Sequence, residues 1–505
     1  MVLIALALRL YHLGAQSFWI DEINVMSFVR SGHLFSDLRD RGGPFEPPLH
    51  FLTVQGALLL PIGFETAARV PSAIFGTVEV LALMLVTREA TNRKVTALIA
   101  GLLLAVAPFA VRYSQENRYY VMFSALSILS WWLLLRALRL RGWTPWLWYG
   151  ACAGAMALTH PFAPLVLIIQ AVVVGVMFWR ERKTPDEPAL ILGYGLAVVI
   201  GVGMIRDWYL YGLAKWIPNA INGTSYTLNP TGKFAVPLDA DLFKRGAEWL
   251  LGNSARATML VALLVILSLG APGLARGRQR IVALVVLAYG LGFALVLVPL
   301  ARALGTYFAF RRVESLLPPF LLLVAITLVA SVDRMLEKQV KVRVALGIGV
   351  ATVALLTIVS LVATNAYYGT QKSNYRAFAQ AVKDAAPGEP IVVGPATHTV
   401  AKLIRQYFDW KGVDRKVIFA IHGERPNIPG SPSRVLWLTT APPNRSDMKT
   451  RPLNDLTSMQ VIAGDRSGLY VILPLFESTS EPTSKAELDA QADTVAELPP
   501  FLSAP

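Results

Sequence analysis

The sequence contains almost no cysteine: Cys152 is the only one in 505 residues, and it lies inside an apolar run. A chain with one cysteine cannot form an intramolecular disulfide, which excludes a fold stabilised by cystine bridges. Charge is also scarce, because only 16% of the residues are charged while 54% are hydrophobic. This composition excludes a soluble globular protein and is typical of a polytopic membrane protein.

The sequence also lacks a Walker loop and a dinucleotide fingerprint, so nothing in it indicates a nucleotide-driven pump or a nucleotide-sugar site. Its 47 Lys and Arg exceed its 33 Asp and Glu, which gives a net charge of +14. The positive residues are not clustered into one binding face but fall in short runs between apolar segments, as they do in cytoplasmic loops. We therefore expect no nucleic-acid partner.

Apolar segments long enough to cross a bilayer recur along the chain, and each needs roughly 17–25 residues. They lie near residues 70–87, 95–112, 119–138, 145–159, 162–179, 189–206, 255–273, 281–301, 313–331 and 344–364. The run Met1–Leu13 adds a shorter one; it reaches only about 20 Å at 1.5 Å per residue, so we expect the true start to lie upstream. The predicted fold class is a polytopic α-helical membrane protein with about 11 transmembrane helices.

The charges predict the topology, because basic loops face the cytoplasm. Five loops are basic: they hold Arg88, Arg93 and Lys94; Arg136, Arg139 and Arg141; Arg180, Arg182 and Lys183; Arg276, Arg278 and Arg280; and Arg334, Lys338, Lys341 and Arg343. The apolar segment Pro47–Pro61 is too short to span, and it would invert every later loop if it did. We therefore predict that it is an interfacial helix, with the N-terminus inside and the C-terminus outside.

This topology brings four unusual polar regions to the outer, non-cytoplasmic face. They are the loop 14–69 with Asp21, Glu22, Glu46 and His50; the segment 113–120 with Glu116, Arg118, Tyr119 and Tyr120; the turn at His160; and the segment 307–312 with Arg311 and Arg312. Ionisable residues at a membrane surface indicate a functional site.

Structural alternatives stay open for each of these residues. Asp21-Glu22 could cap the helix that follows, Arg311-Arg312 could be interfacial anchors, and Tyr119-Tyr120 could belong to an aromatic belt. His160 could be a hydrogen-bonded turn residue. Glu46 and His50 are spaced i, i+4 and could share a helix face as metal ligands, but two ligands are too few for a site. We expect no cofactor and no required metal.

The chain resembles the C superfamily of membrane glycosyltransferases, in the bacterial group related to protein O-mannosyltransferases and the lipid A aminoarabinose transferase. The resemblance covers about residues 9–330. It rests on R-L-Y-H-L-G and S-F-W-I-D-E (9–22), F-E-P-P-L-H (45–50), A-R-V-P-S-A-I-F-G (68–76), Y-S-Q-E-N-R-Y-Y (113–120) and F-R-R-V-E-S-L-L-P-P (310–319).

The resemblance implies inverting transfer of a sugar from a polyprenyl-phosphate carrier to a hydroxyl or amine acceptor at the periplasmic face of a bacterial inner membrane. Asp21 matches the family's general base and Glu22 its neighbour. Arg118 and Arg311 or Arg312 fall where the family binds the lipid phosphate, and Glu46 aligns with an acid that follows the pair. One departure is Pro47, where the aminoarabinose transferases have a lysine. A second is His50, which follows the Pro-Pro-Leu that a histidine precedes in many relatives.

Two other functions remain open. A lipid-linked-sugar flippase would carry its ionisable residues near the middle of the spans, whereas here they lie at the outer ends. A polysaccharide polymerase or ligase with a lipid-diphosphate donor would also need outer arginines. The acceptor, whether glycan, lipid or protein, is not determined by the sequence.

The predicted domains are a transmembrane domain at 1–366, which includes the first periplasmic loop at 14–69, and a small periplasmic α/β domain at 367–476. In that domain, apolar runs at Ile391–Val393, Val417–Phe419, Val435–Leu438 and Leu469–Ile472 predict strands, and Thr399–Phe408 predicts a helix. Residues 477–505 are rich in Pro, Ser and acids, which predicts a disordered tail.

Overall fold

The computed structural model describes residues 1–40, 46–182, 187–221, 255–303, 315–368, 375–384, 391–396, 398–421, 436–439, 459–464 and 470–474. Contacts divide the chain into two compact units. The bundle unit comprises Met1–Leu13 and Ser31–Tyr367, and the C-terminal unit comprises Gly14–Arg30 and Tyr368–Pro505. The segment 14–30, which the sequence places in the membrane domain, thus groups with the C-terminal unit. The predicted tail, 477–505, lies outside the described residues.

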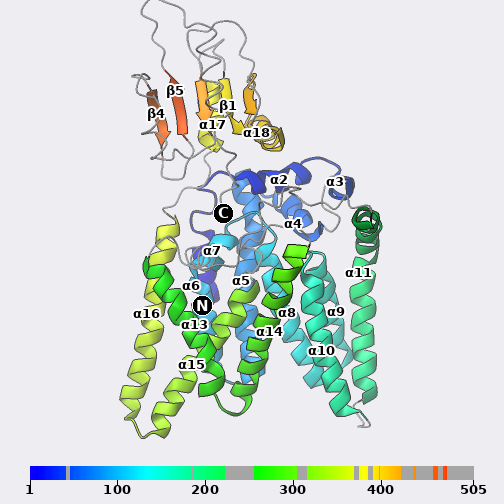
Figure 1. The fold of residues 1–505 in the computed structure, drawn as a ribbon, viewed down its shortest axis with the longest axis vertical. Coiled ribbons are helices and arrows are strands. Elements are labelled where there is room, and N and C mark those ends of the chain that lie inside the picture. Colours follow the sequence, from blue (N-terminus) through cyan, green and yellow to red (C-terminus); the bar gives the residue numbers. More distant parts are fainter. Residues whose placement is uncertain are drawn as a thin grey trace, which may run out of the picture. The chain divides into compact units, whose positions relative to one another are not determined.

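The bundle unit is built around helix α5 (Phe64–Thr91), which contacts α1 (Val2–Leu10), α4 (Leu49–Ala57), α6 (Lys94–Val106), α7 (Pro108–Ser114) and α8 (Tyr120–Leu140) (Figure 1). On one side, α8 packs on α9 (Trp143–Ala157) and α10 (Ala163–Glu181), and α9 packs on α11 (Glu187–Ile221). On the other, α6 packs on α15 (Leu317–Glu337), which contacts α13 (Ala255–Leu274) and α14 (Gly277–Ala303).

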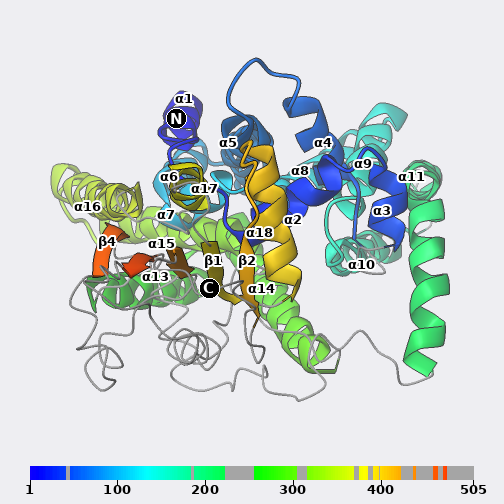
Figure 2. The same ribbon diagram turned by 90° about the horizontal axis from the view of Figure 1, so that it is seen from above.

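The outer helices expose their apolar residues, as lipid-facing helices do. Figure 2 shows α11 and α16 (Val342–Tyr368) at opposite edges of the bundle. In the most apolar 18-residue stretch of each helix, only 17% of α11 and 11% of α16 is buried, compared with 61% of α8. Exposed apolar side chains such as Leu192 and Val350 require a non-aqueous surrounding, which a bilayer supplies.

Six described helices are long and apolar enough to cross a membrane, or seven if α6 and α7 count as one broken span. The segment predicted at 95–112 forms this bent pair, in which α6 ends at Val106 and the chain bends by 60° before α7 begins at Pro108. Proline lacks the N–H that would continue the helix and disfavours helical geometry in the residue before it. Within the segment predicted to be interfacial, the structure places α4, whose nine residues reach only about 14 Å.

Arg9 of α1 repairs this break. Its guanidinium is fully buried and donates to the carbonyl oxygens of Ala105 (3.1 Å) and Leu104 (3.4 Å) at the end of α6. In an unbroken helix the carbonyl oxygen of Leu104 would accept from the N–H of residue 108, which proline lacks; here it accepts instead from Ala107 N at 3.4 Å and from Arg9. Arg9 Nε also donates to Ser114 Oγ at 3.1 Å in α7. Arg9 is therefore a buried hydrogen-bond donor to both helices of the bent pair.

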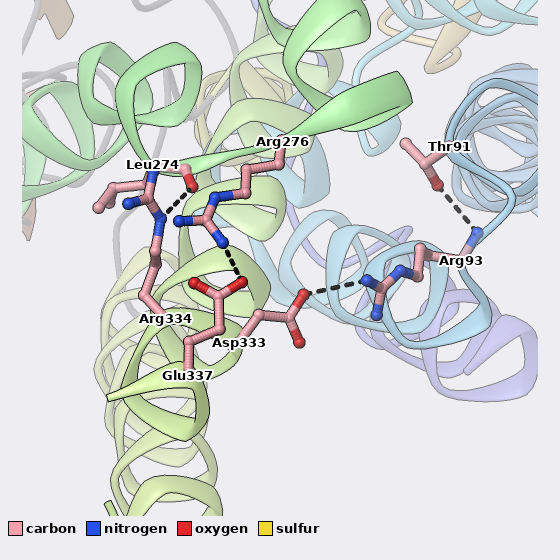
Figure 3. Close-up of polar contacts among 7 residues, drawn as sticks. All are labelled: Thr91, Arg93, Leu274, Arg276, Asp333, Arg334 and Glu337. Atoms are coloured by element: carbon pink, nitrogen blue, oxygen red, sulfur yellow. Dashed lines mark hydrogen bonds and ion pairs between the residues drawn. The ribbon is translucent and has the colours of Figure 1, made fainter. Parts of the chain in front are cut away.

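The end of the bundle that carries the basic loops is cross-linked by ion pairs (Figure 3). Arg93 contacts Asp333 at 3.1 Å, Arg276 contacts Glu337, and Arg334 donates to the carbonyl oxygen of Leu274 at 3.1 Å. Arg139 pairs with Glu89 at 3.0 Å and Arg141 with Glu181 at 2.5 Å. The exposed pairs Arg93–Asp333 and Arg276–Glu337 contribute about 0–1 kcal/mol each. They connect the ends of α5, α8, α10 and the α13–α15 group at one level of the bundle.

The C-terminal unit combines α2 (Ile20–Val29), α17 (Tyr375–Asp384) and α18 (His398–Trp410) with a five-stranded sheet. The strands are β1 (Ile391–Ala396), β2 (Ile418–Ile421), β3 (Leu436–Thr439), β4 (Met459–Gly464) and β5 (Tyr470–Pro474), in the order β2-β1-β3-β5-β4. Parallel pairs β1–β2 and β1–β3 adjoin an antiparallel β3–β5–β4 edge. The crossover from β1 to β2 is α18, because parallel neighbours cannot be joined by a tight turn.

Gly76 tests whether the Arg9 contact sets the stability of the bundle. A Cβ at position 76 would lie 2.0 Å from Ser114 Oγ and 2.8 Å from Arg9 Nε, so Gly76→Ala must displace Ser114 and disturb its hydrogen bond with Arg9. We expect a loss of about 1–3 kcal/mol from overpacking, measured as a lower melting temperature of the purified protein in detergent.

The matched control is Gly175→Ala in α10, where an added Cβ meets nothing within 4 Å. Equal melting temperatures for the two variants would contradict the structural role assigned to the Arg9–Ser114 contact.

Candidate functional site

The candidate site of the bundle unit is built around the loop 115–119 between α7 and α8. Gln115 fixes the start of this loop: its side-chain Nε2 donates to the carbonyl oxygens of Arg9 (3.1 Å) and Tyr11 (2.6 Å). These carbonyls lie at the end of α1, where no helical N–H follows to satisfy them. Gln115 therefore attaches the loop to the end of α1, and Arg9 of α1 in turn donates to the carbonyl oxygens at the end of α6.

His50 and Asn117 form the buried floor of this site. Both side chains are fully buried, and His50 Nε2 lies 3.1 Å from Asn117 Oδ1. The N-terminus of α4 is held in place because Leu49 N donates to the carbonyl oxygen of Leu158 at 2.9 Å. His50 Nδ1 has no hydrogen-bond partner among the described residues. Burial, and secondly the positive charge of Arg118, lower the pKa of His50 to about 3, so the ring is neutral at physiological pH.

Arg118 is the half-buried cation of the site. Its guanidinium carbon lies 4.8 Å from the ring centre of Tyr119 and 5.4 Å from that of Tyr120, and Nη2 donates to Tyr120 Oη at 3.3 Å. Its backbone carbonyl accepts a hydrogen bond from Ser72 Oγ of α5 at 3.3 Å. Backbone and side chain are thus both held, and the aromatic rings keep the guanidinium in a fixed direction.

An aromatic wall surrounds His160 beside these tyrosines. Its ring stacks on Phe123 at 4.7 Å and meets Tyr119 edge-on at 5.2 Å. His160 Nδ1 accepts a hydrogen bond from Phe162 N at 3.0 Å, so the residue is also the hydrogen-bonded turn that the sequence offered as an alternative. His50 reaches the same wall, with ring centres 6.1 Å from Tyr119. The structure therefore brings Arg118, Tyr119, Tyr120, His50 and His160 together.

Glu116 does not contribute a free carboxylate to this group. Its side chain is 2% exposed and lies 3.6 Å from Arg112 Nε, four residues earlier. A buried carboxylate needs such a positive partner, and the pair closes the turn between α7 and the loop. Glu116 therefore belongs to the frame of the site, by which we mean the buried residues whose polar contacts hold the loop 115–119 and its neighbours in place.

Glu46 lies in the non-helical residues that precede α4, whereas His50 lies in the first turn of that helix. The hypothesis that the two share a helix face is therefore wrong. Pro47 and Pro48 lie between them, immediately before the helix begins at Leu49, and proline is common at the start of helices. Among the residues that the structure describes, no group of three His, Cys, Asp or Glu side chains is arranged for a metal ion.

The acidic pair lies in the C-terminal unit, where its two members differ. Glu22 is fully buried, and its Oε2 accepts a hydrogen bond from Trp19 N at 3.2 Å, which closes a capping box at the start of α2. Asp21 is half-buried in the first turn of the same helix. The capping role considered for the pair thus falls to Glu22. Arg311 and Arg312 lie outside the described residues, and their assignment stays a prediction.

Sequence reasoning missed three members of the frame: Arg9, Ser72 and Asn117. Each lies inside a motif that was recognised, at positions 9–22, 68–76 and 113–120. Their hydrogen-bond partners are 46 to 105 residues distant in sequence. The motif marked them, but only the tertiary structure gives their partners.

Residues 45–205 match the family profile described as dolichyl-phosphate-mannose-protein mannosyltransferase. The fold is similar to that of ArnT from Cupriavidus metallidurans bound to undecaprenyl phosphate, with 15% identity over 95% of this chain and 98% of that chain and a TM-score of 0.52. The apo form of that protein gives 14% identity over the same shares and a TM-score of 0.53. A search of curated proteins found no match. The family profile thereby confirms, over residues 45–205, the predicted resemblance to membrane mannosyltransferases, and the likeness to ArnT shows a shared fold.

The lowered pKa of His50 makes stability depend on pH. Between its ordinary value of 6.5 and about 3, the unfolded chain binds a proton at His50 that the folded chain does not. Acidification from pH 7 to pH 5 should therefore destabilise the wild type, by at most about 1.4 kcal/mol per pH unit below 6.5. The melting temperature of His50→Gln should fall less over the same range.

His33→Gln, at an exposed histidine of the bundle unit, controls for the loss of an imidazole. If His50→Gln and the wild type lose equal melting temperature on acidification, the burial of a neutral His50 is refuted.

Proposed function

We propose that this chain is an inverting glycosyltransferase that moves a sugar from a polyprenyl-monophosphate carrier to a hydroxyl or amine acceptor. The observation that carries the proposal is Arg118, a half-buried guanidinium held against two tyrosine rings beside a neutral histidine. The family profile over residues 45–205 supports the class of reaction. The ArnT structure with undecaprenyl phosphate has the same fold, which supports the class of donor.

Arg118 suits a phosphate ligand for physical reasons. The guanidinium group stays charged at any working pH and presents two parallel N–H donors that match two phosphate oxygens. Poor solvation at the lipid boundary strengthens these hydrogen bonds. The neighbouring His50 carries no charge, so it neither competes for the phosphate nor adds a proton to it. Its Nδ1 remains a neutral polar group of the same site.

Asp21 acts as the general base in this proposal, as the sequence resemblance implies. It accepts the acceptor's proton as the glycosidic bond forms on the face of the anomeric carbon opposite to the departing phosphate. The polyprenyl phosphate leaves with the bonding electrons, and arginine stabilises its growing negative charge. Glu22 is occupied by the capping box, so of the pair only Asp21 is assigned to chemistry.

We further propose that the protein is a multi-pass protein of the bacterial inner membrane and that its site faces the periplasm. The basic residues Arg139 and Arg141 lie at the C-terminal end of α8, whereas Arg118 lies just before its N-terminus, at the opposite end of that helix. The positive-inside rule assigns the basic end to the cytoplasm. Glycans, lipids or proteins of the cell envelope are the acceptors that such a site can reach.

Arg118→Ala tests the donor assignment. We expect kcat/KM for a polyprenyl-phosphate sugar to fall on the order of 10²–10³-fold, because one charge-assisted donor to the departing phosphate is lost. The KM for the acceptor should stay unchanged in steady-state assays with purified enzyme. The control is Arg139→Ala at the basic end of the bundle, which should retain turnover. Equal losses for donor and acceptor would show that Arg118 does not bind the phosphate.

Asp21→Asn tests the base. Removing a general base should lower turnover by about 10²–10⁴-fold, while the melting temperature and the binding of the donor stay those of the wild type. Asp384→Asn, at the exposed end of α17 in the same unit, is the matched loss of a carboxylate. Near-normal turnover of Asp21→Asn would rule out this residue as the base.

A further inference from the structure

The helix that carries Asp21 is attached to the C-terminal unit on several sides. Helix α2 packs against α18, and the segment Gly14–Arg30, which contains α2, belongs to that unit. Phe18, just before α2, is fully buried, and its ring meets that of Tyr407 edge-on at 6.5 Å. At the other end of α2, the guanidinium of Arg30 lies 5.5 Å from the ring centre of Trp410. Both ends of the helix are therefore held by α18.

Arg376 of α17 holds the chain that leads into α2. Its Nη2 donates to the carbonyl oxygens of Gly14 (3.0 Å) and Gln16 (3.3 Å), and its Nη1 donates to that of Ala15 (3.3 Å). Three successive carbonyl oxygens that converge on one guanidinium define the path of this segment. Tyr375, the residue before Arg376, is buried against Tyr407, so the arginine itself is fixed by the core of the unit.

These contacts act in series on Asp21. The Arg376 hydrogen bonds set residues 14–16, the Phe18–Tyr407 contact sets the next turn of chain, and the Trp19–Glu22 capping box sets the start of α2. Asp21 lies in the first turn that this box orients. A side chain at a helix start has its direction fixed by the cap, because the cap determines the first backbone angles of the helix.

We infer that Arg376 of the C-terminal unit is a positioning residue for the proposed reaction: through the carbonyl oxygens of 14–16 it fixes the helix start that presents Asp21. This inference rests on the proposed role of Asp21 as base. A loss of precise placement costs turnover and not donor affinity, because a general base works only within hydrogen-bonding distance of the proton it accepts.

Arg376→Ala should lower kcat on the order of 10–100-fold with the KM for the donor unchanged, as a displaced catalytic group does. Arg376→Lys, which keeps a cation and donors for the carbonyl oxygens, should restore part of the loss. Arg405→Ala is the matched control: Arg405 is exposed on α18 and contacts Val417 and Phe419, not residues 14–30. Turnover of Arg376→Ala equal to that of Arg405→Ala would overturn the inference.

Two further measurements separate positioning from general loss of structure. Hydrogen exchange of the α2 amides should accelerate in Arg376→Ala while the amides of α5 and α8 stay as protected as in the wild type. Combined with Asp21→Glu, which moves the carboxylate but keeps it, Arg376→Ala should cost less than the product of the single losses, since both act on one group. The inference is refuted if the loss of turnover in the double variant equals the product of the two single losses. It is also refuted if the hydrogen exchange of the α2 amides is unchanged in Arg376→Ala. An active Asp21→Asn variant would instead refute the proposed function and leave the exchange result standing.

Discussion

The bundle depends on one constraint: in a bilayer, a broken helix must find hydrogen-bond donors within the protein. The break between α6 and α7 deprives the carbonyl oxygens of Leu104 and Ala105 of their usual helical donors, and Arg9 donates to both, beside a bond from Ala107 N to Leu104 O. Gln115 completes the exchange by donating to the carbonyl oxygens at the end of α1. A buried guanidinium is costly without such partners. The carboxyl group of Glu79, also buried, adds an electrostatic interaction with Arg9.

The hydrogen bonds between Gln115 and the end of α1 also position the loop 115–119. Each polar side chain of this loop then has its own contact. Gln115 binds α1, Glu116 pairs with Arg112, and Asn117 meets His50. These three side chains point into the frame. Arg118 follows them as the half-buried cation, and its guanidinium lies against the adjacent rings of Tyr119 and Tyr120. Of these four consecutive polar residues, Gln115, Glu116 and Asn117 are buried and Arg118 is half-buried.

The sequence predicts the long helices well, because apolar runs with charged ends mark α8, α15 and α16. It also predicts α4, since 14 apolar residues are too few to span. It does not predict the break at Pro108, where the apolar run continues through a change of backbone direction. Nor does it separate Glu22 from Asp21: adjacent carboxylates look alike until the Trp19–Glu22 hydrogen bond shows which one caps the helix. Local patterns fix the elements, whereas the partners of Arg9, His50 and Arg376 depend on contacts distant in sequence.

Pro47 bears on the charge balance of the proposed chemistry. Where the aminoarabinose transferases have a lysine, this chain has a buried proline at the approach to α4, which offers neither charge nor donor. A sugar esterified to a polyprenyl monophosphate carries one negative charge, and the departing phosphate carries two. Arg118 alone balances the donor. Transfer is accelerated only if the enzyme stabilises the departing phosphate more strongly than it stabilises the bound donor. The additional negative charge of the departing phosphate therefore requires a second cation. In the proposed mechanism Arg311 or Arg312 supplies it, and an aminoarabinose-type donor site built on a lysine is disfavoured.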